Sequence, residues 1–416
     1  MTTAVIGGGL AGLAAATWLA RAGKRVTLFE KARTGGRART RALHGALFNQ
    51  GPHALYRAGR AMELLRSLGI RPSGGSPPLS GNLAWCGGRL CALPVGTVSL
   101  LTTSLLSLQE KLELARLLAG LGHLDATALE GLTLDAWLAR ALSHERCREV
   151  LRSVVRLASY ANHPESISAG AAVRQLRLAA AGNVLYLHGG WQTLVDALRA
   201  AATSAGVRII EGTPAERLEQ AHGAVAAVHA GGERLAAREV VLAVPPRAAA
   251  VVSGLAVMHQ LADRLTPIRA ACLDLVLREL PCPRHTFALG IDRPYYFSIH
   301  SHVARLGPEG LHVMLAAKYL SRCDEGAAAL PELEAFVDAV QPGWREHVMT
   351  RRFLPELVVT HAVPTPHGRP PVDAAGVSGL YLCGDWVGPE GMLADAALSS
   401  AAQVARRLGC TPEAAA

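Results

Sequence analysis

The hydrophobic pattern at the start of the chain indicates a strand, a helix and a second strand in immediate succession. Residues 3–6 form a short apolar run of the kind that makes a buried parallel strand. Apolar residues then recur at helical spacing over 10–20, and this pattern stops at Gly23. A further apolar run over 26–29 predicts the second strand, which ends at Glu30. This order predicts a β-α-β unit with parallel strands.

Similar segments recur far along the chain. Residues 188–194 contain a Gly-Gly turn that opens a helix, and this helix leads to a predicted strand over 207–210. Residues 240–244 predict a fully buried strand that ends at two prolines. A last strand over 379–383 precedes a loop and a helix. We therefore expect one domain assembled from three separated segments.

The intervening regions predict helices and a sheet. Ser107 and Glu110 have the spacing of a capping box at the start of one helix, and another helix is expected to begin at Ser168. The runs typical of strands are 83–85, 271–277, 295–302 and 311–319. These regions are predicted to form an α+β domain.

Composition narrows the possible classes of protein. Half of the 416 residues are hydrophobic, which excludes a disordered chain. The formal net charge is +9, but the basic residues, nearly all Arg, are spread along the chain without a run of the nucleic-acid-binding type. The eight cysteines show no C-x-x-C spacing, and no metal site is predicted. We expect a cytoplasmic protein that binds no nucleic acid.

A glycine fingerprint lies between the first strand and the first helix. Gly7, Gly9 and Gly12 match G-x-G-x-x-G. The first allows a tight turn, the second lets the backbone approach a pyrophosphate, and the third allows close packing of helix on strand. The first helical amides, at Leu10 and Ala11, are expected to point at the phosphates, where the helix dipole favours negative charge. The segment therefore predicts a dinucleotide site.

The residues after the second strand suggest which dinucleotide is bound. Glu30 is placed to accept hydrogen bonds from a ribose, and Gly35-Gly36-Arg37 and Gly51-Pro52-His53-Ala54 follow. This arrangement resembles the flavoprotein group that contains phytoene desaturases, protoporphyrinogen oxidase and flavin amine oxidases. The resemblance implies FAD, with Lys31, Gly36 and Arg37 near the nucleotide and diphosphate. It also implies that Gly51, Pro52, His53 and Ala54 lie beside the isoalloxazine ring.

Two later segments fit the same group. Gly384-Asp385, followed by Gly391, Met392 and Leu393, resembles its second flavin motif. The resemblance implies that Asp385 contacts the ribityl chain or the phosphates, and that the helix start at Met392 and Leu393 faces the flavin pyrimidine. Ala215 takes the place of a small apolar residue whose backbone meets the adenine.

The resemblance also implies an architecture. It is an α/β fold in which a discontinuous Rossmann-like FAD-binding domain of the glutathione reductase type joins an α+β substrate domain. The expected FAD-binding segments are 1–72, 185–255 and 350–416. The expected substrate domain, a mixed sheet with a helical lobe, comprises 73–184 and 256–349.

The expected function is that of an FAD-dependent oxidoreductase, either a dehydrogenase or desaturase or an oxidase. In this interpretation a lipophilic small molecule transfers hydride to flavin N5, and oxygen or a quinone accepts the electrons. Because the flavin is the reactive group, no side chain is assigned a catalytic role. Three alternatives stay open: a flavin amine oxidase, an NADPH-dependent aromatic hydroxylase and a redox-neutral flavin-dependent isomerase.

Four further side chains are candidates for a role in the site. Lys318, on a predicted strand, is a candidate for the flavin-facing lysine of amine oxidases, although a solvated lysine fits the same pattern. His300 and His302 fall on one face of a predicted strand, but they lack a third metal ligand. His53 is expected to be structural or to lie beside the ring rather than to act as a base.

The uncharged region 90–108 allows two interpretations. It is either helical core or a lipophilic mouth that takes substrate from a membrane surface. The second interpretation predicts peripheral membrane association.

Overall fold

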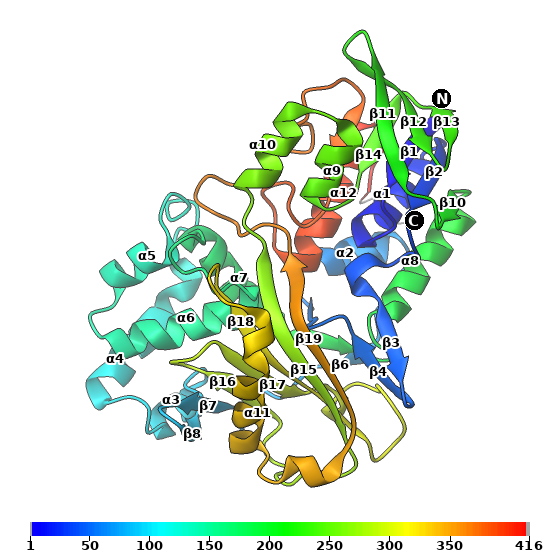
Figure 1. Ribbon diagram of the computed structural model, residues 1–416. Helices are drawn as coiled ribbons and strands as arrows, with labels where there is room; N and C mark the ends of the chain where they lie inside the picture. Colours follow the sequence, from blue (N-terminus) through cyan, green and yellow to red (C-terminus); the bar gives the residue numbers. More distant parts are fainter. Residues whose placement is uncertain (1, 413–416) are drawn as a thin grey trace.

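The computed structural model describes residues 2–412, and a five-stranded parallel sheet lies in one half of it (Figure 1). The strand order is β10-β2-β1-β14-β20, and every neighbouring pair is parallel. The strands are β1 (Thr2–Ile6), β2 (Arg25–Glu30), β10 (Arg208–Glu211), β14 (Glu239–Leu242) and β20 (Leu380–Leu382). Residues at the centre of β1 and β14, such as Val5 and Val241, are fully buried because elements cover both faces of the sheet.

Helices from all three parts of the chain pack around this sheet. The long helices α1, α8 and α12 lie near one another, with α2 against α12, and the sheet β11-β12-β13 contacts β14. The helices are α1 (Leu10–Arg21), α2 (Arg60–Ser67), α8 (Gln192–Ser204), α9 (Pro246–Ser253), α10 (Ala256–Arg264) and α12 (Leu393–Arg407). The antiparallel strands are β11 (Ala215–Ala221), β12 (Ala224–Ala230) and β13 (Glu233–Ala236). The expected Rossmann-like architecture is confirmed.

A seven-stranded mixed sheet forms the other half of the molecule, in the order β19-β15-β18-β17-β16-β7-β8. Its neighbours are antiparallel except for the β16–β7 pair. The strands are β7 (Leu83–Cys86), β8 (Arg89–Ala92), β15 (Ile268–Leu277), β16 (Phe287–Gly290), β17 (Tyr295–Ile299), β18 (His312–Leu320) and β19 (Val348–Thr360).

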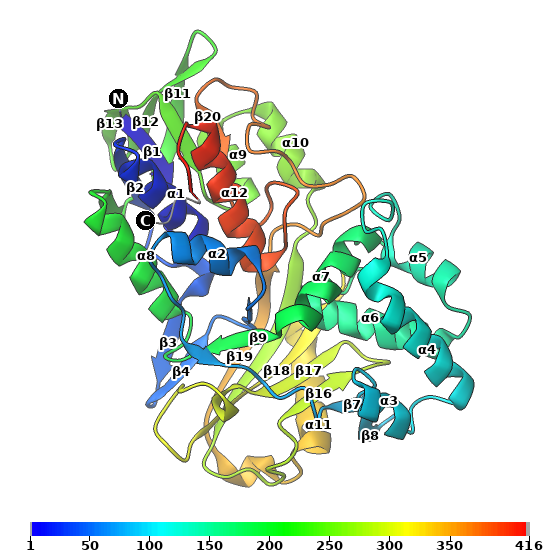
Figure 2. The same cartoon turned by 180° about the vertical axis from the view of Figure 1, so that it is seen from behind.

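Different helices cover the two faces of this sheet, as the view from behind also shows (Figure 2). On β18, Ala317 and Tyr319 join the core shared with a helical lobe, whereas Ala316 and Leu320 join the core under α11 (Ala329–Val340). The lobe comprises α3 (Thr97–Thr102), α4 (Leu108–Gly120), α5 (Leu134–Ala141), α6 (Glu145–Ser159) and α7 (Ala169–Gly182). The alternation of a strand therefore separates residues that face the lobe from residues that face α11.

Short strands connect the two halves. A hairpin and a small antiparallel sheet comprise β3 (Thr40–Leu43), β4 (Ala46–Asn49), β5 (Leu55–Tyr56), β6 (Gly74–Gly75) and β9 (Val184–Leu187). Single turns of 3-10 helix occur at 36–38, 121–123, 300–302, 326–328 and 344–347.

Most local predictions agree with these elements. Ser107 caps α4 in a capping box with Glu110, and Ser168 caps α7. The predicted strand 295–302 is wrong in its last part, because β17 ends at Ile299 and the chain turns through a 3-10 segment. In this turn the backbone carbonyl oxygen of His300 accepts hydrogen bonds from the amides of Val303 and Ala304. His300 and His302 therefore do not share a strand face.

The division into two domains is a proposal, and β19 modifies one of its boundaries. This strand pairs with β15 in the seven-stranded sheet, although the expected third FAD-binding segment begins at residue 350. A thirteen-residue strand cannot be divided between domains without breaking its ladder with β15. We therefore propose that the last FAD-binding segment begins after Thr360.

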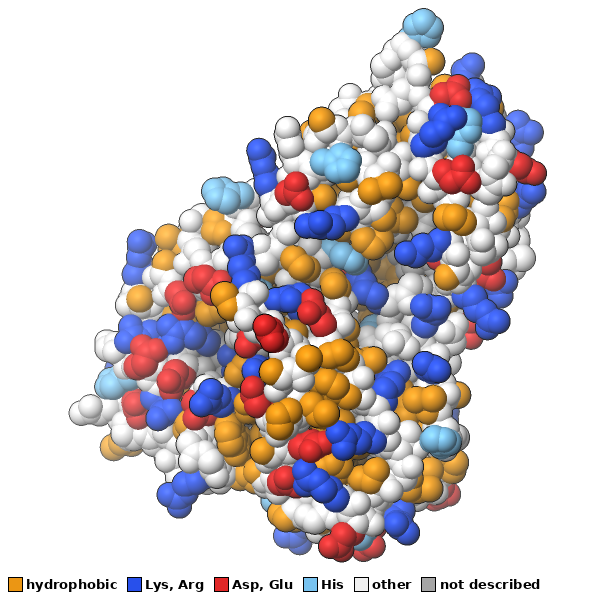
Figure 3. All heavy atoms as spheres, in the orientation of Figure 1, with side chains coloured by type: hydrophobic (Ala, Val, Ile, Leu, Met, Phe, Trp, Pro, Cys, Tyr) orange, Lys and Arg blue, Asp and Glu red, His pale blue; other side chains and the backbone are white. Residues whose placement is uncertain are grey.

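Within residues 2–412, no helix combines the length and apolar character that crossing a bilayer requires. Figure 3 shows Lys and Arg side chains scattered over the visible face with Asp and Glu among them. The net positive charge of +9 therefore has no single focus on this face.

Candidate functional site

A cavity of about 600 Å³ lies where the parallel sheet, the start of α12 and β19 meet. Its walls contain fifteen of the nineteen residues that the sequence predicts for cofactor binding. These are Gly7, Gly9, Leu10, Ala11, Glu30, Lys31, Gly36, Arg37, Pro52, His53, Ala54, Ala215, Gly384, Asp385 and Leu393. Segments separated by hundreds of residues thus meet around one space.

The other four predicted residues do not line the cavity. A Cβ added at Gly12 would lie 1.9 Å from the carbonyl oxygen of Gly7, so the helix packs on the turn as expected. Gly51 and Gly391 both have positive φ, at 89° and 66°. Met392 is the N-cap of α12, and its buried side chain packs into the core of the helical lobe.

The glycine turn exposes backbone to the cavity. Gly9 is the N-cap of α1 without a side-chain cap, and a Cβ added there would meet nothing within 4 Å. The first amides of α1 are therefore open to an anionic ligand. The Glu30 carboxylate accepts hydrogen bonds from the amides of Gly8 at 2.8 Å and Ala32 at 3.0 Å, so it joins the turn to the end of β2.

An ion pair between the half-exposed Arg37 and the buried Asp385 forms part of the cavity wall. Arg37 Nη2 donates to Asp385 Oδ2 at 2.7 Å, across 348 residues of sequence, and Arg37 Nη1 donates to the Val359 carbonyl oxygen. His361 Nδ1 lies 3.2 Å from Asp385 Oδ1. Burial alone would raise the pKa of Asp385, but the Arg37 charge and the His361 hydrogen bond hold this pKa below its ordinary value. The predicted contact of Arg37 with a diphosphate stays a prediction.

The loop after Asp385 is held by one half-buried cation. Arg369 donates to the carbonyl oxygens of Gly388, Asp385, Glu390 and Gly391. Because these four acceptors belong to one short loop, Arg369 fixes the approach to α12.

Several cavity residues are not among those that the sequence predicts for cofactor binding. Tyr160 comes from the end of α6, Leu357 from β19, and His361 from the loop that follows it. Trp191 belongs to the Gly-Gly turn segment, and its ring lies 4.9 Å from that of His53. Only Trp191 had a local signal in the sequence, because the others are brought to the cavity by tertiary packing.

His53 is a neutral group in the cavity wall. Its Nδ1 lies 3.0 Å from the carbonyl oxygen of Gly51, and burial lowers the pKa of His53 to about 4. The imidazole is therefore neutral at physiological pH, and the predicted place of His53 beside the flavin ring stays a prediction.

Lys318 lies away from the cavity. Its neighbours Ala317 and Tyr319 face the helical lobe, so Lys318 faces α11, where Nζ lies 2.9 Å from Glu332 Oε2 and 3.5 Å from Asp324 Oδ1. It is neither the flavin-facing lysine nor a fully solvated one.

The described residues fit a flavin dinucleotide. Both α1 and α12 begin at the cavity with no side-chain cap, so their first amides are free to donate. The Nε1 of Trp191, another cavity residue, is buried without a hydrogen-bond partner. The open backbone at Gly9 supplies the close approach that a pyrophosphate requires.

A family model described as flavin-containing amine oxidoreductase matches residues 10–271, which is more than half of the chain. The chain belongs to this family. As a member of the flavin-containing amine oxidoreductase family, it is an FAD-dependent oxidoreductase, and FAD is its cofactor. No protein of curated function matches the sequence at a significant level.

Solved structures share the fold at low sequence identity. An oxidoreductase from Methanosarcina mazei is 20% identical with a TM-score of 0.78, over 98% of this chain and 100% of that one. Cyclohexylamine oxidase from Brevibacterium oxydans is 20% identical with a TM-score of 0.71, over 98% and 99%. A fatty acid isomerase from P. acnes is 15% identical with a TM-score of 0.68, over 97% and 98%. These similarities concern the fold alone.

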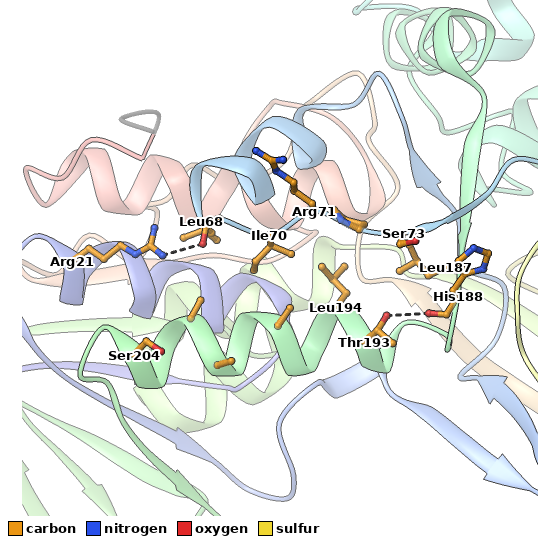
Figure 4. A pocket seen from close by; sticks show the side chains of 15 residues that line it. Arg21, Leu68, Ile70, Arg71, Ser73, Leu187, His188, Thr193, Leu194 and Ser204 are labelled. Carbon is orange, nitrogen blue, oxygen red and sulfur yellow. Dashed lines mark hydrogen bonds between the residues drawn. The ribbon is translucent and has the colours of Figure 1, made fainter. Parts of the chain in front are cut away.

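A second cavity of about 570 Å³ lies beside α8 and contains none of the predicted site residues (Figure 4). Arg21 donates to the carbonyl oxygen of Leu68 at its rim, and Leu194 and Ile70 contribute apolar side chains. This second cavity shares no lining residue with the flavin site.

The glycine turn yields a matched pair of variants. Gly9→Ala should leave the melting temperature of the apoprotein unchanged, because the new methyl group meets no protein atom. It should raise the Kd for FAD by about tenfold or more, since it occupies space that a pyrophosphate needs. Gly12→Ala should instead lower the melting temperature, because its methyl group would collide with the Gly7 carbonyl.

The measurements are thermal melting of the apoprotein and fluorescence titration with FAD. Gly120→Ala, another site where a Cβ meets no atom within 4 Å but far from the cavity, is the control and should change neither quantity. Normal FAD affinity in Gly9→Ala would show that the turn does not approach the cofactor.

Proposed function

We propose that the protein oxidises a largely apolar, non-cationic small molecule by removing hydride from carbon. The observation that carries this proposal is the lining of the cavity outside the nucleotide motifs. Tyr160, Leu357, Val358 and Val359 come from the helical lobe and the seven-stranded sheet, and none of them is charged. FAD, when bound, supplies the hydride acceptor at its N5 position.

The charges of the cavity favour this substrate class over a cationic amine. The lining residues that carry full charge are Glu30, Lys31, Arg37, Arg39 and Asp385. Each belongs to the segments expected to hold the nucleotide, and Asp385 is already paired with Arg37. A bound ammonium group would therefore find no free carboxylate at the substrate end, where burial makes charge costly.

The protein groups have supporting roles in this proposal. The walls from β19 and α6 exclude water from the reacting carbon, and the neutral ring of His53 adds no charge beside it. Oxygen or a quinone is proposed as the final electron acceptor. Amine oxidation, aromatic hydroxylation and isomerisation are the competing outcomes of the test.

Anaerobic titration of the purified holoenzyme separates these reactions. The compounds are carotenoid-like polyenes, tetrapyrroles, apolar carboxylic acids and primary amines. A polyene, tetrapyrrole or acid should bleach the flavin absorbance near 450 nm without NADPH, because the substrate itself supplies the hydride. Bleaching by primary amines alone, bleaching that requires NADPH, or product formation without bleaching would each contradict the proposal.

A second observation supports peripheral membrane contact. Val98, Leu101, Leu108 and Leu112 are 74%, 68%, 74% and 50% exposed on α3 and α4, which pack together. Large apolar side chains gathered on neighbouring elements of a surface commonly mark a contact site. We infer that this apolar patch, defined by these four residues, touches a membrane surface, with the net charge of +9 favouring anionic lipid.

The apolar patch can be tested with vesicles of phosphatidylcholine and phosphatidylglycerol at low salt. The parent protein should sediment with the vesicles, and the double variant Val98→Asp and Leu101→Asp should lose most of this binding. Val251→Asp is the matched control, since Val251 is 67% exposed on α9, and it should bind like the parent. Equal sedimentation of all three proteins, or of none, would contradict the inference.

A further inference from the structure

Tyrosines gather on the face of the seven-stranded sheet that meets the helical lobe. Of the seven tyrosines in the chain, Tyr160, Tyr296 and Tyr319 belong to the core that this face shares with the lobe, and Tyr56 and Tyr186, from the small antiparallel sheet, are buried beside it. The ring centroid of Tyr319 lies 6.1 Å from that of Tyr160 and 6.4 Å from that of Tyr296. The hydroxyl oxygens of Tyr186 and Tyr296 lie 3.0 Å apart. Burial raises the pKa of each hydroxyl, so all five remain protonated donors.

Three of these hydroxyls have partners within the protein. Tyr56 donates to the carbonyl oxygen of Ala158 at 2.7 Å, and the Tyr186 and Tyr296 hydroxyls continue to His300 Nε2, 3.1 Å from Tyr296. Tyr319 is different, because its hydroxyl is fully buried and has no hydrogen-bond partner. A buried polar group without a partner is costly and calls for an explanation.

Arg156 presents a second unpartnered donor beside Tyr319. Its guanidinium carbon lies 6.0 Å from the centre of the Tyr319 ring, and its side chain is only 8% exposed. Nη2 donates to the carbonyl oxygens of Gly290 and Arg293, but Nε is buried without a partner.

The charge of Arg156 is met by neutral acceptors rather than by a paired carboxylate, since Nη1 donates to Asn162 Oδ1 at 3.4 Å and Nη2 donates to two carbonyl oxygens. Within residues 2–412, Arg156 forms no ion pair with a carboxylate. The charge of Asp292 raises the pKa of Arg156. Asp292 is nevertheless exposed, and its carboxylate accepts a hydrogen bond from the amide of Gly87. Burial lowers the pKa of Arg156 to about 10, so the group is still charged at neutral pH. A buried cation of this kind is stabilised by an anion that reaches it.

Tyr160 connects these donors to the flavin cavity. It lines the cavity, its ring lies 6.1 Å from that of Tyr319, and its backbone amide donates to the carbonyl oxygen of Arg156 at 2.7 Å, whereas neither Arg156 nor Tyr319 lines the cavity. Its backbone has a φ of 61°, in the left-handed region that an aromatic residue seldom adopts. Such strain persists where the surrounding structure requires it, and it clusters at ligand sites.

We propose that Arg156 and Tyr319 form an anion subsite for the carboxylate of an apolar carboxylic acid, which enters from the flavin cavity as the side chain of Tyr160 moves aside. The carboxylate accepts from Arg156 Nε and from the Tyr319 hydroxyl, both in charge-assisted hydrogen bonds. The identification of this acid as the substrate rests on the proposed function, whereas the anion subsite itself does not.

The test uses the holoenzyme and a series of ω-phenylalkanoic acids of increasing chain length, each paired with its neutral amide. Binding is measured by calorimetry and by the change in the flavin absorption spectrum. At least one acid should bind about tenfold or more tightly than its amide. Tyr319→Phe should lose about tenfold in affinity for that acid and keep its affinity for the amide.

Stability measurements separate binding from folding. Tyr319→Phe should melt at the parent temperature or above it, because it removes a hydroxyl that has no partner. Tyr56→Phe, the matched control, removes a hydroxyl bonded to Ala158 and should melt lower while binding the acid like the parent. Arg156→Gln should abolish the preference for acid over amide.

The proposal is overturned if no acid binds more tightly than its amide, or if Tyr319→Phe binds the acid like the parent. FAD content is measured for every variant in the same samples. A colourless parent protein would contradict the proposed function, and calorimetry with the same acids would still decide the anion subsite.

Discussion

The ion pair between Arg37 and Asp385 is the interaction on which the arrangement of the site depends. It joins the segment after β2 to the segment after β20, and the second Arg37 nitrogen reaches the carbonyl of Val359 in β19. The Asp385 carboxylate is buried, so it is stable only while its two donors, Arg37 and His361, remain in place. One carboxylate thereby fixes where the parallel sheet meets the seven-stranded sheet, and this meeting line is the wall of the cavity.

The same constraint bears on which side chains of one strand face the helical lobe and which face α11. Once the seven-stranded sheet is fixed against the FAD-binding region, the alternation along β18 decides what each side chain can reach. Tyr319 faces the helical lobe, whereas Lys318 faces α11 and binds Glu332. A shift of one residue in the β15–β18 register would exchange these roles.

The sequence could predict the parts of the site that local physics determines. The turn at Gly7, Gly9 and Gly12 follows from steric rules within a few residues, and the capping box at Ser107 follows from adjacent backbone donors. His361 and Tyr160 could not be found in this way, because a strand pairing and a helix end from distant segments bring them to the cavity. The apolar region 90–108 was ambiguous for a related reason. Hydrophobicity is similar at Leu100, which is buried, and at Leu101, which is exposed, and only packing decides between them.

The central claim is that this ion pair couples the distant segments into one binding site for FAD. A double-mutant cycle with Arg37→Met, Asp385→Asn and the double variant, measured by FAD titration, tests it most directly. Each single variant should raise the Kd for FAD by about tenfold or more, and the double variant should bind FAD no more weakly than the weaker single variant. If the losses of FAD-binding free energy in the two single variants simply add in the double variant, or if both single variants bind FAD like the parent, the ion pair does not couple the segments.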